Sequence, residues 1–293
     1  MSASPATSPP VPAPDGSAVA FLSDRKVVLL DATGGQERIL AEADLSRRQR
    51  PAWSPDGKQI AYFAPDPVHF GIEIIWSVPA AGGLPTPLTT IEAKGERNGP
   101  SFERVARWSP DMRRIAVSGA LGPISVVPLD VTAGNAKRVN GGEPDWSTDT
   151  RTVLYSETLN GALSLDDVVT DDIQPYRNEK RLVGTRLDED APQGPMPRFN
   201  ADASLILYRA KGDPDPAVAV RERATGLEQL FLPGNHPAWA PDGQWIVYET
   251  GTVAPARGAL GSVWQAAGLA RVRADGSGQT AVLADAMWPA WGK

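Results

Sequence analysis

The chain has 293 residues, of which 41% are hydrophobic and 22% charged, a composition that is ordinary for a globular protein and excludes global disorder. Its net charge of −6 gives no overall attraction to nucleic acid or anionic lipid, so neither is expected as a partner. Cysteine is absent, which excludes disulfides, thiolate metal sites and a cysteine nucleophile, and no stretch has the length and apolarity needed for membrane insertion.

The N-terminal residues 1–10 are rich in serine, proline and alanine. They contain neither the basic region nor the apolar region of a signal peptide. This composition predicts a flexible lead-in, and it fits either a frayed terminus or a tether to something upstream.

The rest of the chain, residues 11–293, carries an internal repeat. The string P-A-W-S-P-D-G occupies residues 51–57 and returns as P-A-W-A-P-D-G at residues 237–243. Weaker copies stand between and before these two. Aligned on the turn aspartate, the six copies place in register Asp15, Asp56, Asp111, Asp149, Asp202 and Asp242.

Each copy predicts four short strands. A β-rich stretch such as Q-I-A-Y-F follows the turn, then a second stretch, a glycine-rich turn and a short last strand. No segment shows a helical period. Repeats of about 40 residues with four strands each are typical of propeller blades, which bury both faces of every sheet by packing around an axis. We therefore expect one all-β domain, a six-bladed β-propeller of four-stranded antiparallel blades.

The repeated residues have structural roles in this prediction. Proline is tolerated at the start of a strand, and the tryptophan supplies buried area between neighbouring sheets. The S-P-D-G string is turn chemistry, in which aspartate bonds the backbone and glycine accepts a positive φ.

The two ends of the chain together predict how the ring closes. Residues 288–292 repeat the tryptophan strand without its turn, whereas the first copy has the turn without the tryptophan. We expect the C-terminal strand Trp288 to Trp291 to join the first blade by pairing with the strand Ala18 to Leu22.

The W-S-P-D-G core, followed by an I-A-Y/F strand and a glycine-rich turn, resembles the repeat of the TolB-like propeller family over about residues 11 to 293. The resemblance implies a protein–protein interaction platform without a cofactor, located in the periplasm or outside the cell. The smaller α/β domain of TolB itself has no counterpart here, so its lipoprotein partner is not carried over. No hydrolase domain with a G-x-S-x-G nucleophile motif follows the propeller.

Residues suited to catalysis are few. The two histidines, His69 and His236, lie far apart in the sequence and suggest a hairpin tip and a loop rather than a zinc site. No acidic cluster has the spacing of a calcium loop. A calcium-dependent propeller hydrolase, of the lactonase or phosphotriesterase class, is the alternative, and it would need several acidic side chains converging at the channel mouth.

The predicted loop lengths point to one face of the disc. Tight P-D-G turns and glycine turns belong to one face, while the long connections fall on the other. Variable loops on a rigid ring are common binding sites, although drift in loop length is the plainer explanation. The expected partner-binding residues are the basic Arg47, Arg48, Arg50, Lys94 and Arg97, the acidic Asp188, Glu189, Asp190, Asp213 and Asp215, the hairpin-tip residue His69, and the aromatic Phe70, Phe102 and Trp264. Arg104 is a further basic residue expected on the same face.

A charged row is also expected on the inner strands. The residue before the aromatic anchor is Arg107, Asp145 or Arg198 in three successive copies. Such a row would neutralise charges that are poorly solvated at the channel wall. The sequence thus predicts a monomeric, non-catalytic binding protein with a protein partner and no metal.

Overall fold

The computed structural model describes most of the repeat region in detail. It covers residues 11–31, 37–43, 49–69, 72–92, 104–118, 124–129, 137–139, 142–156, 163–167, 180–182, 197–211, 215–255 and 262–284. Within these ranges every regular element is a strand, and no helix meets the length and hydrophobicity that a bilayer crossing requires.

The described strands form six four-stranded antiparallel sheets, each built from four consecutive strands. The first two sheets contain β1 (Val11–Pro12), β2 (Ala18–Ser23), β3 (Lys26–Asp31), β4 (Glu37–Glu42), and β5 (Ala52–Trp53), β6 (Gln59–Pro65), β7 (Ile72–Pro79), β8 (Thr86–Glu92). The third and fourth contain β9 (Val105–Trp108), β10 (Arg114–Ser118), β11 (Ile124–Pro128), β12 (Lys137–Val139), and β13 (Gly142–Trp146), β14 (Thr152–Ser156), β15 (Leu163–Asp167), β16 (Lys180–Leu182). The last two contain β17 (Arg198–Phe199), β18 (Leu205–Ala210), β19 (Ala217–Glu222), β20 (Glu228–Pro233), and β21 (Asn235–Trp239), β22 (Trp245–Pro255), β23 (Ser262–Arg273), β24 (Thr280–Ala284).

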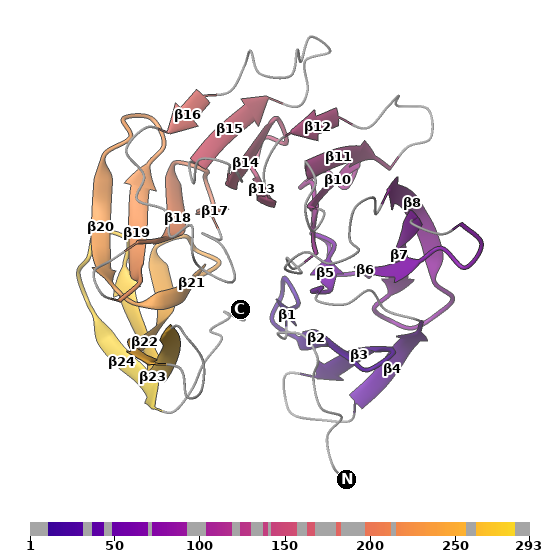
Figure 1. The fold of residues 1–293 in the computed structure, drawn as a ribbon, viewed down its shortest axis with the longest axis horizontal. Coiled ribbons are helices and arrows are strands. Elements are labelled where there is room, and N and C mark those ends of the chain that lie inside the picture. The colour runs from indigo at the N-terminus through magenta and orange to yellow at the C-terminus, as the bar shows by residue number, and fades with distance from the viewer. Residues whose placement is uncertain are drawn as a thin grey trace.

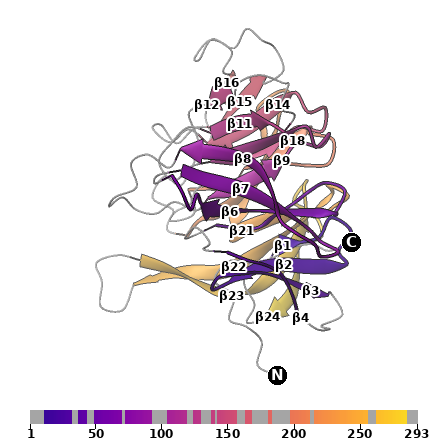
Figure 2. The ribbon, with the colours of Figure 1, turned by 90° about the vertical axis from the view of Figure 1, so that its right-hand side faces the viewer.

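The sheets stand around a common axis in the manner of a β-propeller (Figure 1). The first strand of each sheet lies near the axis and the fourth lies at the rim, as β1 and β4 show. Seen from the side, the sheets form a disc from which the ends of β22 and β23 extend (Figure 2).

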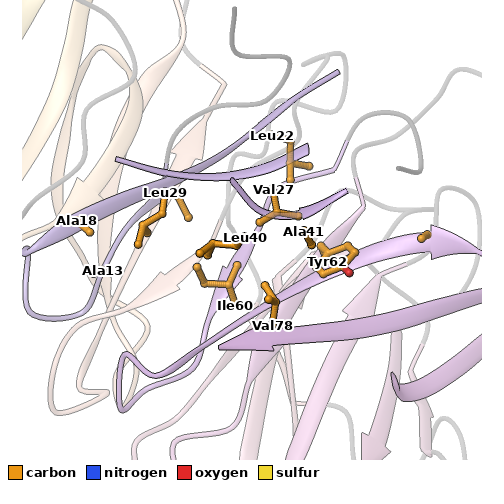
Figure 3. Packing of buried hydrophobic residues seen from close by; sticks show 12 residues of the cluster. Ala13, Ala18, Leu22, Val27, Leu29, Leu40, Ala41, Ile60, Tyr62 and Val78 are labelled. Atoms are coloured by element: carbon orange, nitrogen blue, oxygen red, sulfur yellow. The ribbon is translucent and has the colours of Figure 1, made fainter. Parts of the chain in front are cut away.

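Buried apolar side chains fill the spaces between consecutive sheets. Among the described residues there are five such clusters, and each joins one sheet to the next, from the first sheet to the sixth. Between the first two sheets, Leu29 and Leu40 face Ile60 and Val78 (Figure 3). Each fully buried side chain of this size contributes about 1.5–3 kcal/mol, so these contacts are the main attraction between blades.

The turn between the first two strands has the same network in successive sheets. In the second sheet Asp56 accepts hydrogen bonds from the Ser54 hydroxyl at 2.6 Å and from the Lys58 amide at 3.1 Å. The Ser54 hydroxyl and then the Lys58 amide lower the pKa of Asp56 below its usual value. Gly57 has a φ of 69°, where a side chain is disfavoured. The S-P-D-G string is therefore the turn that the sequence predicts.

In three other sheets the corresponding turn has a positive φ at this position although the residue is not glycine. The corresponding residues are Met112, Thr150 and Ala203, with φ values of 58°, 63° and 58°. Because a left-handed conformation costs a non-glycine residue about 1–2 kcal/mol, the surrounding hydrogen bonds must hold these turns in place.

The tryptophans link the inner strands in addition to packing between sheets. In four sheets the indole N–H of the repeat tryptophan donates to a backbone carbonyl of the preceding sheet. The acceptor stands one residue before the position that corresponds to the tryptophan in that sheet. The contacts are Trp53 to Val11 at 2.9 Å, Trp108 to Ala52 at 3.1 Å, Trp146 to Arg107 at 3.0 Å, and Trp239 to Arg198 at 3.2 Å. Phenylalanine replaces tryptophan in the fifth sheet, where the Phe199 amide instead donates to the Asp145 carboxylate at 2.8 Å.

The prediction that the C-terminal strand pairs with the inner edge of β2 is wrong. The N-terminal strand β1 occupies that edge, with Val11 opposite Ala20 and Pro12 opposite Val19. The indole of Trp53 fixes β1 there, so the first sheet has four strands without help from the C-terminus. Residues 288–291 lie outside the described residues, and a closed six-bladed ring remains a prediction.

Candidate functional site

The chain direction assigns each connection to one face of the disc. Each inner strand begins, and each second strand ends, on the same face, which we call the long-loop face. The opposite face, which we call the turn face, carries the first-to-second and third-to-fourth turns. Hairpins on the long-loop face differ in length: β22 and β23 have 11 and 12 residues, whereas β18 and β19 have six each.

Buried polar contacts fix the base of the long-loop face in the second and third sheets. The Gln49 side chain, 2% exposed, both donates to the Phe63 carbonyl and accepts from the Phe63 amide, each at 2.7 Å. Next to it, the buried Arg104 guanidinium lies 2.8 Å from the Glu73 carboxylate. A buried ion pair with a missing partner is strongly unfavourable, so both side chains hold their places together.

A second polar cluster supports the long hairpin of the sixth sheet. The Glu249 carboxylate is 1% exposed and accepts a hydrogen bond from the Trp264 indole at 2.9 Å. The same oxygen lies 2.8 Å from Nδ1 of His236, at the start of β21. His236 has a φ of 43°, which is strained for a residue other than glycine.

The neighbouring fifth sheet braces the same hairpin. The Asp215 carboxylate accepts a hydrogen bond from the Val253 amide at 2.6 Å. Because Val253 pairs with Trp264 across the hairpin, this contact and the Glu249 cluster hold both strands of the hairpin.

The tip of the second-sheet hairpin is ordered by its own aspartate. Asp66 accepts hydrogen bonds from the amides of Val68 and His69 at 2.8 and 3.0 Å, and its other oxygen lies 3.2 Å from Nδ1 of His69. The amide bonds from Val68 and then His69 lower the pKa of Asp66. Val68 is 78% exposed, so an apolar side chain stands at this tip.

Three charged residues lie on consecutive inner strands, one position before the aromatic anchor: Arg107 on β9, Asp145 on β13 and Arg198 on β17, called here the inner row. Burial, and next the charge of Arg198, lower the pKa of Arg107 to about 9, while Asp145 acts in the opposite direction. Burial raises the pKa of Asp145, whereas Arg198, the Phe199 amide and Arg107 lower it. The three charges therefore interact across two sheet boundaries.

No protein-family model matches the sequence. An uncharacterized protein of Agrobacterium fabrum is 28% identical over 209 residues, which cover 67% of this chain and 67% of that protein. The crystal structure of TolB from Acinetobacter baumannii superposes with a TM-score of 0.57 at 17% identity, over 94% of this chain. The chain therefore has a β-propeller fold that is similar to the propeller of TolB.

The chain covers 63% of the length of Acinetobacter TolB. It is also similar to a chain in the crystal structure of the mitotic checkpoint complex, with a TM-score of 0.63 at 16% identity over 96% of this chain and 77% of that one. At such identities the likeness concerns the fold alone.

The part of the chain that the structure describes contains four of the predicted partner-binding residues, which belong to several sheets. Arg50 is partly exposed, His69 stands at a hairpin tip, and Asp215 and Trp264 brace the long hairpin. Arg104, expected among the surface charges, is instead buried against Glu73. The others lie outside the described residues: Arg47, Arg48, Phe70, Lys94, Arg97, Phe102, Asp188, Glu189, Asp190 and Asp213.

The alternative of a calcium-dependent hydrolase finds no support in the described residues. Among the described residues, no group of three or more histidine, aspartate or glutamate side chains is arranged to hold a metal ion.

Sequence reasoning missed the buried polar residues under the long-loop face. A signal was present in the repeat, because Gln49, Arg104 and Asn235 all stand four residues before the tryptophan. All three are at most 3% exposed. Glu73, the partner of Arg104, and Glu249, the partner of His236 and Trp264, carry no such pattern, and only the folded strands bring these pairs together.

Proposed function

We propose that this TolB-like propeller is a non-catalytic interaction platform whose protein partner binds on the long-loop face. The observation that carries the proposal is the hairpin of β22 and β23, which extends from the disc on a base of buried hydrogen bonds. A projecting element that is held rigidly loses little conformational entropy on binding.

The contrast with the turn face supports this choice of face. The turn face repeats one hydrogen-bond network, in which aspartates such as Asp56, Asp111 and Asp149 serve the turn itself. On the long-loop face, side chains such as Val68 and His69 reach solvent from an ordered tip. Binding residues usually lie on loops that a rigid scaffold positions.

The comparisons support an interaction role only at the level of the fold. TolB and a chain of the mitotic checkpoint complex share the propeller, and the second of these is by its name part of a complex. We extend the proposal to a periplasmic or extracellular location and a monomeric state, on the sequence resemblance to TolB-like propellers.

Site-specific photo-cross-linking tests the proposal. A photoreactive phenylalanine analogue is placed at Val68 on the long-loop face or at Leu84 on the turn face, two apolar residues of the same sheet that are 78% and 87% exposed. In the source cells, the Val68 position should yield a discrete cross-linked protein and the Leu84 position should not. Cross-linking of the same protein from Leu84, or of none from Val68 and a second site at His69, would contradict the proposal.

A further inference from the structure

The inner strands place two arginines beside the axis in matching conformations. Arg107 donates from one terminal nitrogen to the Ala106 carbonyl at 3.1 Å, and Arg198 donates likewise to the Pro197 carbonyl at 2.6 Å. Each guanidinium has five N–H donors, so this bond leaves others for a ligand. Both side chains are partly exposed.

The tryptophan hydrogen bonds keep these residues in one row. The Arg107 carbonyl accepts from Trp146, and the Arg198 carbonyl accepts from Trp239. Between them, Asp145 accepts from the Phe199 amide, so one of its carboxylate oxygens already has a partner. The backbone positions of all three residues are therefore tied to the neighbouring sheets.

Positive charge exceeds negative charge around this row. Arg198 and Arg50 both disfavour the charged form of Arg107, while Asp145 and Glu143 favour it. The effect of Arg198, which lies two sheets away, is larger than that of Asp145, which lies one sheet away. The row itself contains two arginines and one aspartate, so its formal charge is positive, which favours an added anion.

We propose that the inner row binds an oxyanion, a carboxylate or a phosphate group, between the guanidinium groups of Arg107 and Arg198. Planar guanidinium groups match both anions through paired, charge-assisted hydrogen bonds. The inner strands begin on the long-loop face and the row lies nearer their other ends, directly before the aromatic anchor, so a group from the long-loop face would have to reach along the axis to the site. A bound carboxylate or phosphate would add a contact of defined chemistry to the proposed interface. The anion site rests on the proposed function only in taking the partner protein as the source of that group.

Calorimetric titration at constant ionic strength tests the proposal with four probes. These are inorganic phosphate, citrate, an acetylated and amidated tetrapeptide with two glutamates, and its glutamine counterpart. Saturable binding of phosphate or citrate indicates a free small anion, whereas binding of the glutamate peptide alone indicates a carboxylate on a partner protein. Absence of saturable binding of all the anionic probes to the unmodified protein, or saturable binding of the glutamine peptide equal to that of the glutamate peptide, would overturn the proposal.

Variants locate the site. Arg107→Gln with Arg198→Gln should weaken binding about tenfold or more, since each charge-assisted bond is lost. The matched control is Arg113→Gln on the exposed turn face, which should bind as the unmodified protein does. Undiminished binding by a folded double variant would contradict the assignment. If the double variant does not fold, each single variant is compared with Arg113→Gln, and equal affinities would overturn it. Failure of anion binding would leave the cross-linking result at Val68 unaffected, so the two proposals fail separately.

Discussion

The turn face and the long-loop face of this propeller differ in how their polar residues are used. On the turn face, Ser109 and Asp111 repeat the contacts that Ser54 and Asp56 make, with hydroxyl-to-carboxylate distances of 2.5 and 2.6 Å. On the long-loop face, the described polar contacts differ from sheet to sheet, and one of them is the ion pair of Arg104 and Glu73. Repetition on one face and variety on the other indicate that the first stabilises the blades and that the second is available for recognition.

The largest expected effect comes from the tryptophans that tie the blades together. Trp146 is 6% exposed and donates to the Arg107 carbonyl, so Trp146→Ala should lower the free energy of unfolding by about 3–5 kcal/mol. Trp146→Phe removes the N–H but keeps a ring and should cost about 1 kcal/mol. Urea unfolding measures both. Equal losses in the two variants would show that the hydrogen bond, and not packing, carries the stability.

The turn aspartates should make the turn face sensitive to acid. The hydroxyl of Ser147 and then the Arg151 amide lower the pKa of Asp149 below its usual 3.8. A carboxyl whose folded pKa is lowered contributes stability above its unfolded pKa and loses it as the pH falls through the folded value. Asp149→Ala should therefore cost about 1–2 kcal/mol near neutral pH and progressively less below pH 3.8. A difference that does not change with pH would contradict this account.

The turns without glycine offer a smaller effect of opposite sign. Met112 has a φ of 58° and is 40% exposed, so Met112→Gly should raise the free energy of unfolding by about 0.5–1 kcal/mol. Gly57→Ala is the matched control and should lower it by a similar amount, because its added methyl group has room but its φ of 69° remains unfavourable. Thermal unfolding of the two variants checks both signs. Loss of stability in the Met112 variant would show that its side chain contributes more than the strain costs.

The smallest expected effect is on the long-loop face. His69 is 71% exposed at its side chain and contacts Asp66 within the same hairpin tip. His69→Ala should change the free energy of unfolding by less than about 0.5 kcal/mol. A loss comparable to that of Asp149→Ala would mean that this face also stabilises the blades, and the comparison between faces would not hold.

The repeat was sufficient to predict the strands, the turns and the TolB-like fold. Each copy shows its periodicity and turn residues locally, and packing of tryptophan between sheets follows from its size. The inner strand of the first sheet was mispredicted, because Val11–Pro12 lacks the tryptophan by which the other copies were aligned. A two-residue strand has little pattern of its own.

The described part of the candidate site was less predictable, because its contacts join residues that are distant in sequence. Nothing near Glu249 indicates that His236 and Trp264 will share its carboxylate. Likewise Asp215 has the appearance of an exposed loop charge until the hairpin of the next sheet brings Val253 to it.

The central claim is that recognition uses the long-loop face. Hydrogen–deuterium exchange tests it most directly, measured with and without the partner protein that cross-linking identifies. Binding should slow amide exchange in residues 65–69, 250–255 and 262–268, which belong to two of the hairpins of this face. Exchange in the turns at residues 54–58, 109–113 and 147–151 should not change. Protection of those turns, with the hairpins unaffected, would place the partner on the opposite face and contradict the account.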